Sequence, residues 1–375
     1  MISRETFSIL EKNRVKQKVT LLLGARRVGK TALLRKLYLQ HESNALWLNA
    51  EDALTESLLE ERSVANYKRI IGDKTLLIID EAHFIPDIAR KAKLMIDNIQ
   101  PLHIVLTGSS AFELEQNAAP LAGRTVTLHM HPLAQSEWQS MENALQTKEN
   151  LPDRLVYGGY PELSSISDLR EKVFYLNELV NTYLLKDILI FEQIRNAQIM
   201  KDLLVLLAYQ IGSEVSANEL GRQLGVSKNT VERYLDLFEK AFILFPLSGY
   251  SNNLRKEVSK SKKYFFWDNG IRNALINDFS PISTRGDVGS LWEQYFIQER
   301  RKFKDYSLDV CQHHFWRTYD QQEIDLIEIE NRQIQAFECK WKPSKSRIPK
   351  AFAKAYPKAA FNEVHSENYL EWITD

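Results

Sequence analysis

The sequence predicts an α/β protein in three parts, on three observations. Apolar runs that are hydrophobic on both faces recur between residues 19 and 128, with helix-like segments between them, as in a parallel sheet. After about residue 135 helix signals replace this pattern, and two β-like runs follow near residues 323–341. We therefore expect a parallel-sheet domain at 1–140, a helical region at 141–270 and a second α/β domain at 271–375.

The composition is that of an ordinary globular protein. The 375 residues are 44% apolar, which suffices for two or three cores, and 49 basic residues balance 49 acidic ones. Any basic surface must therefore be local. Cys311 and Cys339 lack metal-type spacing, which favours a reducing compartment without structural disulfides. With no signal-like start and no run near ~18 apolar residues, we expect a cytoplasmic protein with no membrane partner.

A glycine-rich loop follows the apolar run at residues 19–23 and precedes a helix-like run at residues 32–40. It fits the pattern G-x-x-x-x-G-K-[ST] at every fixed position, in the strand–loop–helix context that the pattern requires. Backbone N–H groups in such a loop point at phosphates, so we expect ATP here, with Lys30 neutralising the phosphates and Thr31 ligating Mg²⁺. The predicted nucleotide-binding residues in the loop are Gly24, Ala25, Arg26, Arg27, Val28, Gly29, Lys30, Thr31 and Ala32.

A second apolar run, at residues 75–81, ends in two carboxylates. Asp80 is expected to hold the Mg²⁺ through water, and Glu81 to polarise the water that attacks the γ-phosphate. This pair predicts hydrolysis rather than binding alone. The alternative is that both acids are ordinary first-turn residues of a helix after a strand.

Two further elements complete the expected ATP site. The run at residues 102–110 carries Thr107 and Ser109 at its end, and either hydroxyl could sense the γ-phosphate. Arg124 precedes another β-like run at residues 126–128. Three roles remain open for it: stabilising transition-state charge in its own subunit, doing so in a neighbouring subunit, or forming a structural salt bridge. The second role implies a homo-oligomer, for which a hexameric ring is one form.

The middle region contains a helix-turn-helix pattern. Ser216 and Ser227 are typical N-caps, and Gly225 supplies the turn between two amphipathic segments. A β-hairpin wing is expected over residues 245–251 and 262–267. Its basic residues and the front of the second helix predict DNA contacts at Lys228, Asn229, Arg233, Lys260, Lys262 and Lys263. The alternative is an ATPase lid or protein-contact element whose basic face is solvated.

The two β-like runs near the C-terminus predict a hairpin with a turn at Asn331. A two-residue turn there places Asp325 opposite Glu338, and strand alternation puts Lys340 on the face of Glu338. Two carboxylates and a lysine predict a metal-dependent phosphodiesterase site, with Mg²⁺ or Mn²⁺ on Asp325 and Glu338 and with Lys340 positioning the nucleophile or neutralising charge. The basic stretch that follows predicts backbone contacts to DNA at Lys342, Lys345 and Arg347. The alternative is an exposed amphipathic hairpin beside a solvated basic segment.

Several motifs resemble those of one family. Residues 24–31 (GARRVGKT), 76–83 (LLIIDEAH), 105–114 (VLTGSSAFEL) and 120–124 (PLAGR) resemble the bacterial and archaeal AAA-type ATPases of the STAND-related branch. Residues 157–162 (YGGYPE), 183–188 (YLLKDI) and 266–270 (FWDNG) are similar to ATPases whose C-terminal part resembles PD-(D/E)xK nucleases.

The resemblance implies an AAA-type P-loop domain, a helical and winged-helix middle region and a PD-(D/E)xK nuclease-like domain. It adds Glu293 as an acid from a preceding helix, although Ile324 stands where such nucleases usually have proline. It also implies branched or irregular DNA as the partner. Two other functions fit the same motifs: an ATP-switched DNA-binding regulator without cleavage, in mobile-element or defence contexts, and a protein-remodelling ATPase.

Overall fold

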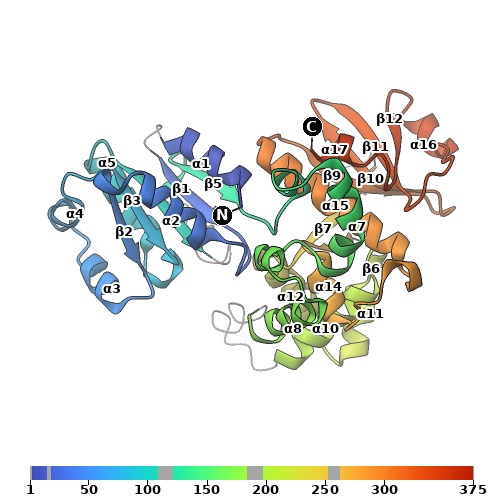
Figure 1. Ribbon diagram of the computed structural model, residues 1–375, viewed down its shortest axis with the longest axis horizontal. Helices are drawn as coiled ribbons and strands as arrows, with labels where there is room; N and C mark the ends of the chain where they lie inside the picture. The colour runs from blue at the N-terminus through green and yellow to red at the C-terminus, as the bar shows by residue number, and fades with distance from the viewer. Residues whose placement is uncertain (1, 15–17, 109–120, 184–196, 252–261, 375) are drawn as a thin grey trace. The chain divides into compact units, whose positions relative to one another are not determined.

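The chain forms two compact units in the computed structural model (Figure 1). The structure describes residues 2–14, 18–108, 121–183, 197–251 and 262–374. Unit 1 comprises Met1–Leu133 with Lys240–Phe242, and unit 2 comprises Ala134–Glu239 with Ile243–Asp375. Among the described helices, none is long and apolar enough to cross a membrane.

Unit 1 is built on a parallel sheet with the strand order β2-β3-β4-β1-β5. The sheet confirms the predicted α/β class. Strands β1 and β3 are buried at every position because helices cover both of their faces. The strands are β1 (Val19–Leu23), β2 (Ala45–Asn49), β3 (Leu76–Asp80), β4 (His103–Gly108) and β5 (Thr125–His129). The helices are α1 (Glu5–Arg14), α2 (Lys30–Gln40), α3 (Ala53–Glu60), α4 (Val64–Ile71) and α5 (Ile88–Asn98), with a short turn of helix η2 (Ala82–Phe84) after β3.

Unit 2 combines helices with a seven-stranded sheet of order β12-β11-β10-β9-β7-β8-β6. Its strands are β6 (Glu214–Val215), β7 (Leu244–Gly249), β8 (Lys262–Phe266), β9 (Gln312–Arg317), β10 (Glu323–Glu330), β11 (Gln333–Cys339) and β12 (Ala360–Val364). Its described helices are α6 (Gln135–Gln139), α7 (Ala144–Tyr157), α8 (Leu169–Glu178), α10 (Ala197–Tyr209), α11 (Ala217–Leu224), α12 (Lys228–Lys240), α14 (Asn269–Leu275), α15 (Val288–Ser307), α16 (Lys350–Ala355) and α17 (Leu370–Ile373). The long helix α15 contacts both β8 and β11 and so ties the two ends of the sheet together.

The expected wing differs from the observed hairpin. Strands β7 and β8 pair antiparallel, as predicted, but β7 also pairs in parallel with β9 through Ser248 and His314. The hairpin is therefore an interior part of the unit 2 sheet, which runs across the boundary that the sequence predicted at residue 270. Strands β6 to β12 form one sheet because β7 pairs with β9.

Two of the family-like motifs meet in unit 2 and form a structural junction. Asp268 is buried, and its carboxylate accepts hydrogen bonds from the backbone N–H of Gly159 at 2.7 Å and of Ile271 at 3.1 Å. Gly158 has φ +77°, and a Cβ there would lie 2.1 Å from a carboxylate oxygen of Asp268. These contacts give both motifs, at residues 157–162 and 266–270, a structural role in the packing of unit 2.

Asp268 should give unit 2 a pH-dependent stability. Burial raises the pKa of Asp268 from 3.8 to about 6, although the N–H of Gly159 opposes the shift. Because the folded state binds this proton more tightly, the contribution is complete below the unfolded pKa and is lost as pH rises through about 6. Over that window the free energy of unfolding should fall by about 3 kcal/mol more for wild type than for Asp268→Asn. Urea unfolding at pH 4 to 7 measures this, and equal slopes for the two proteins would contradict it.

Candidate functional site

The glycine-rich loop connects the end of β1 to the start of α2. A Cβ on Gly24 would lie 2.1 Å from the backbone oxygen of Met130, so only glycine fits beside the chain that leaves β5. Gly29, which precedes α2, has φ +101°, a left-handed conformation that also favours glycine. The two fixed glycines of the motif are therefore required by the backbone path.

Lys30 lies inside the loop. Its side chain is 5% exposed, and its ammonium donates hydrogen bonds to the backbone oxygens of Gly24 at 2.7 Å and Ala25 at 2.9 Å. Thr31 follows in the first turn of α2 and is half-buried. A buried cation at a helix N-terminus with exposed N–H groups fits the polyphosphate of a nucleotide.

Arg4 clamps the loop to the sheet. Its buried guanidinium donates to the backbone oxygen of Val28 and to that of His131, both at 2.6 Å. Arg4 lies just before α1 and therefore holds the glycine-rich loop and the segment after β5 together. We had no sequence-based reason to select this arginine, because it lies twenty residues before the motif.

The two acids after β3 are positioned by the end of β4. The Thr107 hydroxyl donates to Asp80 at 2.6 Å and accepts from the backbone N–H of Glu81 at 2.9 Å. Thr107 was predicted to contact nucleotide, but its one hydroxyl proton goes to Asp80, so its observed contacts orient the acids. Glu81 has φ +50°, and its carboxylate lies 3.3 Å from His83 Nδ1. Ser109, the other predicted sensor, lies outside the described residues.

Arg124 is placed away from the loop of its own subunit. It precedes β5, whose first residue, Thr125, pairs with Val19 at the start of β1, whereas the loop follows the other end of β1. Five residues of strand span roughly 13 Å. Arg124 Nε instead forms an ion pair with Asp97 at 2.7 Å. Of the three roles left open for Arg124, this position argues against the one at the nucleotide of its own subunit, and the ion pair supports the structural one.

A second site lies on the unit 2 sheet. Strands β10 and β11 pair with Leu326 opposite Phe337, which confirms the predicted hairpin register and puts Asp325 and Glu338 side by side. The backbone N–H of Cys339 donates to Asp325 at 2.7 Å, and Lys340 donates to Glu338 at 2.7 Å. Glu293 on α15 joins them from the covering helix.

Lys263 was predicted to bind DNA, and the structure contradicts this. Its side chain is 1% exposed and forms ion pairs with Glu293 at 3.4 Å and with Glu323. Because Lys263 belongs to the inward face of β8, it points into the sheet-and-helix interior instead of at solvent. We use "carboxylate cluster" for Glu293, Glu323, Asp325 and Glu338. Glu323 and Lys263 also belong to this site, and neither was predicted to do so.

Burial and mutual repulsion control the charge of the carboxylate cluster. Burial raises the pKa of Asp325 well above its usual value, and the nearby Glu293 and Glu338 raise it further. Burial also raises the pKa of Glu293, against the opposing charge of Lys263. For Lys263 itself, burial lowers the pKa, but Glu293 and Glu323 outweigh it and the net shift is upward. Partly buried carboxylate oxygens that repel one another are a donor set that suits a hard divalent cation such as Mg²⁺ or Mn²⁺.

The remaining predicted DNA contacts are on the surface of unit 2. Helices α11 and α12 are joined by a turn in which Gly225 has φ +67°, and Ser216 caps α11 as predicted. Exposed side chains among the predicted set are Lys228, Asn229, Arg233, Lys262, Lys342, Lys345 and Arg347. Lys228 forms an ion pair with Glu232 at 3.2 Å, and Lys260 lies outside the described residues.

Family models cover most of the chain in three consecutive segments. Residues 16–139 match the AAA domain. Together with the loop geometry, this match shows that unit 1 is an AAA-type P-loop ATPase domain. Residues 148–281 and 288–369 match two domains of unknown function, DUF8612 and DUF4143.

Similar full-length proteins occur in bacteria and archaea. An uncharacterized protein of Haemophilus influenzae is 27% identical over 355 residues, covering 87% of this chain and 84% of its own. One of Mycobacterium tuberculosis is 26% identical over 328 residues, which cover 86% of this chain and 70% of that protein. One of Methanocaldococcus jannaschii is 25% identical over 370 residues, which cover 91% of this chain and 79% of that protein.

Weak structural similarity is found to several solved structures. The RuvB Holliday junction branch migration motor of Thermotoga maritima is 19% identical, covers 65% of this chain and 89% of its own, and has a TM-score of 0.32. Drosophila ORC bound to DNA is 14% identical, covers 74% and 94%, and has a TM-score of 0.27. The assignment of the AAA domain rests on the family model and the loop, and not on these structures.

Proposed function

We propose that this protein is an ATP-hydrolysing, DNA-binding protein whose carboxylate cluster cleaves phosphodiester bonds with Mg²⁺ or Mn²⁺. The observation that carries the proposal is the pairing of Asp325 with Glu338, beside Glu293 and Lys340, in the same compact unit as α11 and α12. A cleavage site and a DNA-binding element in one unit fit a protein that binds and cuts one substrate. Branched or irregular DNA remains part of the proposal through the family resemblance.

In the AAA domain each residue has a separate task. Lys30 is placed to exchange the loop carbonyls for phosphate oxygens, and Thr31 and Asp80 are the residues that would hold Mg²⁺. The ion supplies charge neutralisation for the β- and γ-phosphates. Glu81 orients and polarises the attacking water, while Thr107 keeps both acids in place.

In the carboxylate cluster Asp325, Glu338 and Glu293 would hold the metal, which supplies an activated water and charge stabilisation. Lys340 is half-exposed and hydrogen-bonded to Glu338, so its ammonium can turn toward the developing negative charge at phosphorus. The exposed residues Lys342, Lys345 and Arg347 follow directly and suit backbone phosphates. Hydrolysis of ATP would then control how unit 2 engages DNA.

One observation favours a different function for unit 2. Lys263 already places a buried positive charge between Glu293 and Glu323, which is the charge that a metal would otherwise contribute. A protein that kept the fold but not the cleavage would bind DNA under control of ATP without cutting it. The two functions differ in one measurable property, metal-dependent strand cleavage.

Cleavage of a labelled four-way junction and a matched duplex tests the proposal directly. We expect wild type to cut with Mg²⁺ or Mn²⁺, with a dependence on ATP, and Glu338→Ala to lose about 100-fold or more in rate. Lys342→Ala, an exposed neighbour outside the carboxylate cluster, should weaken binding but retain cutting. Binding in a gel shift with no cutting by wild type would establish the ATP-controlled DNA-binding protein instead.

Glu81→Gln separates ATP binding from hydrolysis. The amide keeps the size of the side chain but cannot accept the proton of the attacking water, so ATP should bind and turnover should fall by about 100-fold. Binding of a fluorescent ATP analogue and phosphate release measure the two properties. Normal turnover in this variant would mean that another group activates the water.

A further inference from the structure

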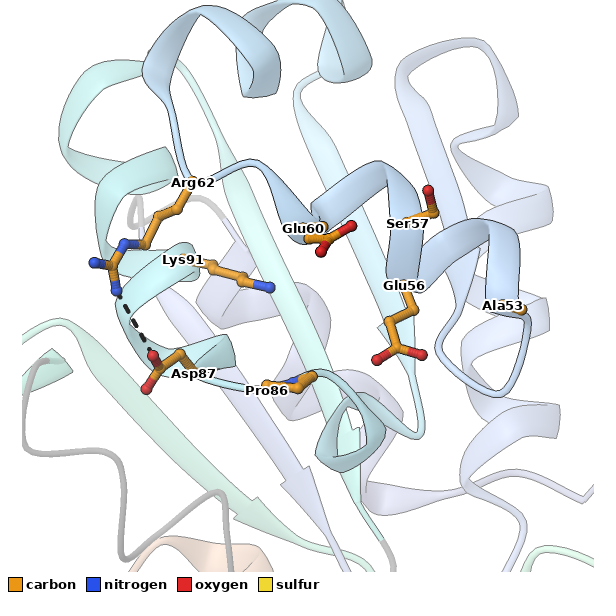
Figure 2. A pocket seen from close by; sticks show the side chains of 8 residues that line it. All are labelled: Ala53, Glu56, Ser57, Glu60, Arg62, Pro86, Asp87 and Lys91. Carbon is orange, nitrogen blue, oxygen red and sulfur yellow. Dashed lines mark ion pairs between the residues drawn. The ribbon is translucent and has the colours of Figure 1, made fainter.

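Unit 1 contains a cavity of about 680 Å³ between helices α3 and α5 (Figure 2). Both walls follow the carboxyl ends of strands, because α3 comes after β2 and α5 comes after β3. Ligands of open α/β sheets bind at this edge. The lining contains no residue of the glycine-rich loop and neither Asp80 nor Glu81. The lining residues are Ala53, Glu56, Ser57, Glu60, Arg62, Pro86, Asp87 and Lys91.

Lys91 is the cation of this cavity that is available to a ligand. It is 7% exposed, and Figure 2 shows its ammonium pointing into the space between the two helices. The structure gives it no hydrogen bond or ion pair with any described residue; the pair in the lining is Arg62 with Asp87, at 3.7 Å. Burial lowers the pKa of Lys91, although Asp87 and Glu56 counteract this. A largely buried lysine whose ammonium meets no hydrogen-bond partner favours binding of an anion.

The opposite wall is acidic. Glu56 and Glu60 stand one helical turn apart on the exposed side of α3 and line the cavity, and neither forms a hydrogen bond or ion pair with a described residue. Asp87 pairs with Arg62 and with Arg90, the latter at 3.8 Å. The groups left to bind a ligand are therefore one cation and two carboxylates, with a net charge of −1.

We propose that this cavity binds a free basic α-amino acid, with its carboxylate on Lys91 and its two cationic groups on Glu56 and Glu60. Such a ligand has one negative and two positive groups and neutralises the cavity. Its methylene chain can pack on Ala53 and Pro86. A polyphosphate would meet the repulsion of two carboxylates, and a simple diamine would leave Lys91 without an anion. This site is independent of the proposed nuclease and ATPase chemistry.

Calorimetric titration of the full chain with L-lysine and three analogues tests the proposal. Cadaverine lacks the carboxylate, norleucine lacks the side-chain ammonium, and Nα-acetyl-L-lysine lacks the α-ammonium. Because each analogue loses one charged contact, each should bind about tenfold or more weakly than L-lysine. No binding of L-lysine, or equal binding of any analogue, would overturn the proposal.

Variants assign the contacts. Lys91→Met should abolish the preference for L-lysine over cadaverine. Glu60→Gln should abolish the preference for L-lysine over norleucine. Lys91→Met removes a buried, unpartnered charge and should melt no lower than wild type, so loss of binding cannot be ascribed to unfolding. Lys93→Met on the same helix lies outside the lining and should bind as wild type does. If Lys91→Met still preferred L-lysine to cadaverine, the assignment of the carboxylate contact to Lys91 would be wrong. Lys30→Ala, which changes the ATP site alone, should bind L-lysine as wild type does.

Discussion

Lys30→Ala should abolish ATP turnover. The ammonium is buried in the glycine-rich loop and held within 2.9 Å of two backbone oxygens, so its charge is fixed where the loop would hold phosphates. Removing a fixed positive group from a phosphoryl-transfer site typically costs about 100- to 1,000-fold in rate. We expect at least this loss in phosphate release, together with weakened nucleotide binding.

A matched control lies on the same helix. Arg35 is an exposed cation of α2, one turn and a residue beyond Lys30, and Arg35→Ala should hydrolyse ATP at the wild-type rate. Circular dichroism of both variants checks that α2 and the sheet remain folded. Unchanged turnover in Lys30→Ala would remove the loop from the catalytic site, whereas equal losses in both variants would indicate a general effect of charge.

The parts of the fold that the sequence predicted are those with local causes. The glycine-rich loop requires Gly24 and Gly29 for its own backbone path, so its pattern is contained in eight residues. The register of β10 and β11 follows from a two-residue turn, in which Asn331 and Arg332 have φ +50° and +67°. Such turns fix which residues face each other across the hairpin, and the relation of Asp325 to Glu338 was therefore predictable.

The features that the sequence did not predict depend on distant partners. Lys263 was assigned to the surface because it stands in a basic stretch, but β8 lies between β6 and β7 and directs this residue inward to Glu293 and Glu323. Arg4, just before α1, likewise contacts a part of the loop that is 24 residues away in the sequence. Each case is a tertiary contact that no short window of sequence contains.

Lys263→Met should destabilise unit 2 strongly, and a divalent cation should restore the loss. Removing one partner of a buried ion pair leaves uncompensated carboxylates, which typically costs about 3–5 kcal/mol. Lys263 is 1% exposed and faces Glu293 and Glu323, so water cannot take over its role. In thermal melts without metal, the variant should therefore unfold well below wild type. Lys263→Arg should be intermediate, because it keeps the charge but changes the geometry.

Addition of Mn²⁺ then distinguishes the two functions proposed for unit 2. If the carboxylate cluster binds metal, Mn²⁺ should raise the melting temperature of Lys263→Met more than that of wild type, because the ion takes over the charge that the ammonium supplied. Lys262→Met, at the exposed neighbouring position on β8, should melt and respond as wild type does. A variant that is destabilised but indifferent to Mn²⁺ would make Lys263 the permanent counter-charge of the carboxylate cluster. Cleavage would then have to be assigned elsewhere, and the ATP-controlled DNA-binding function would be favoured.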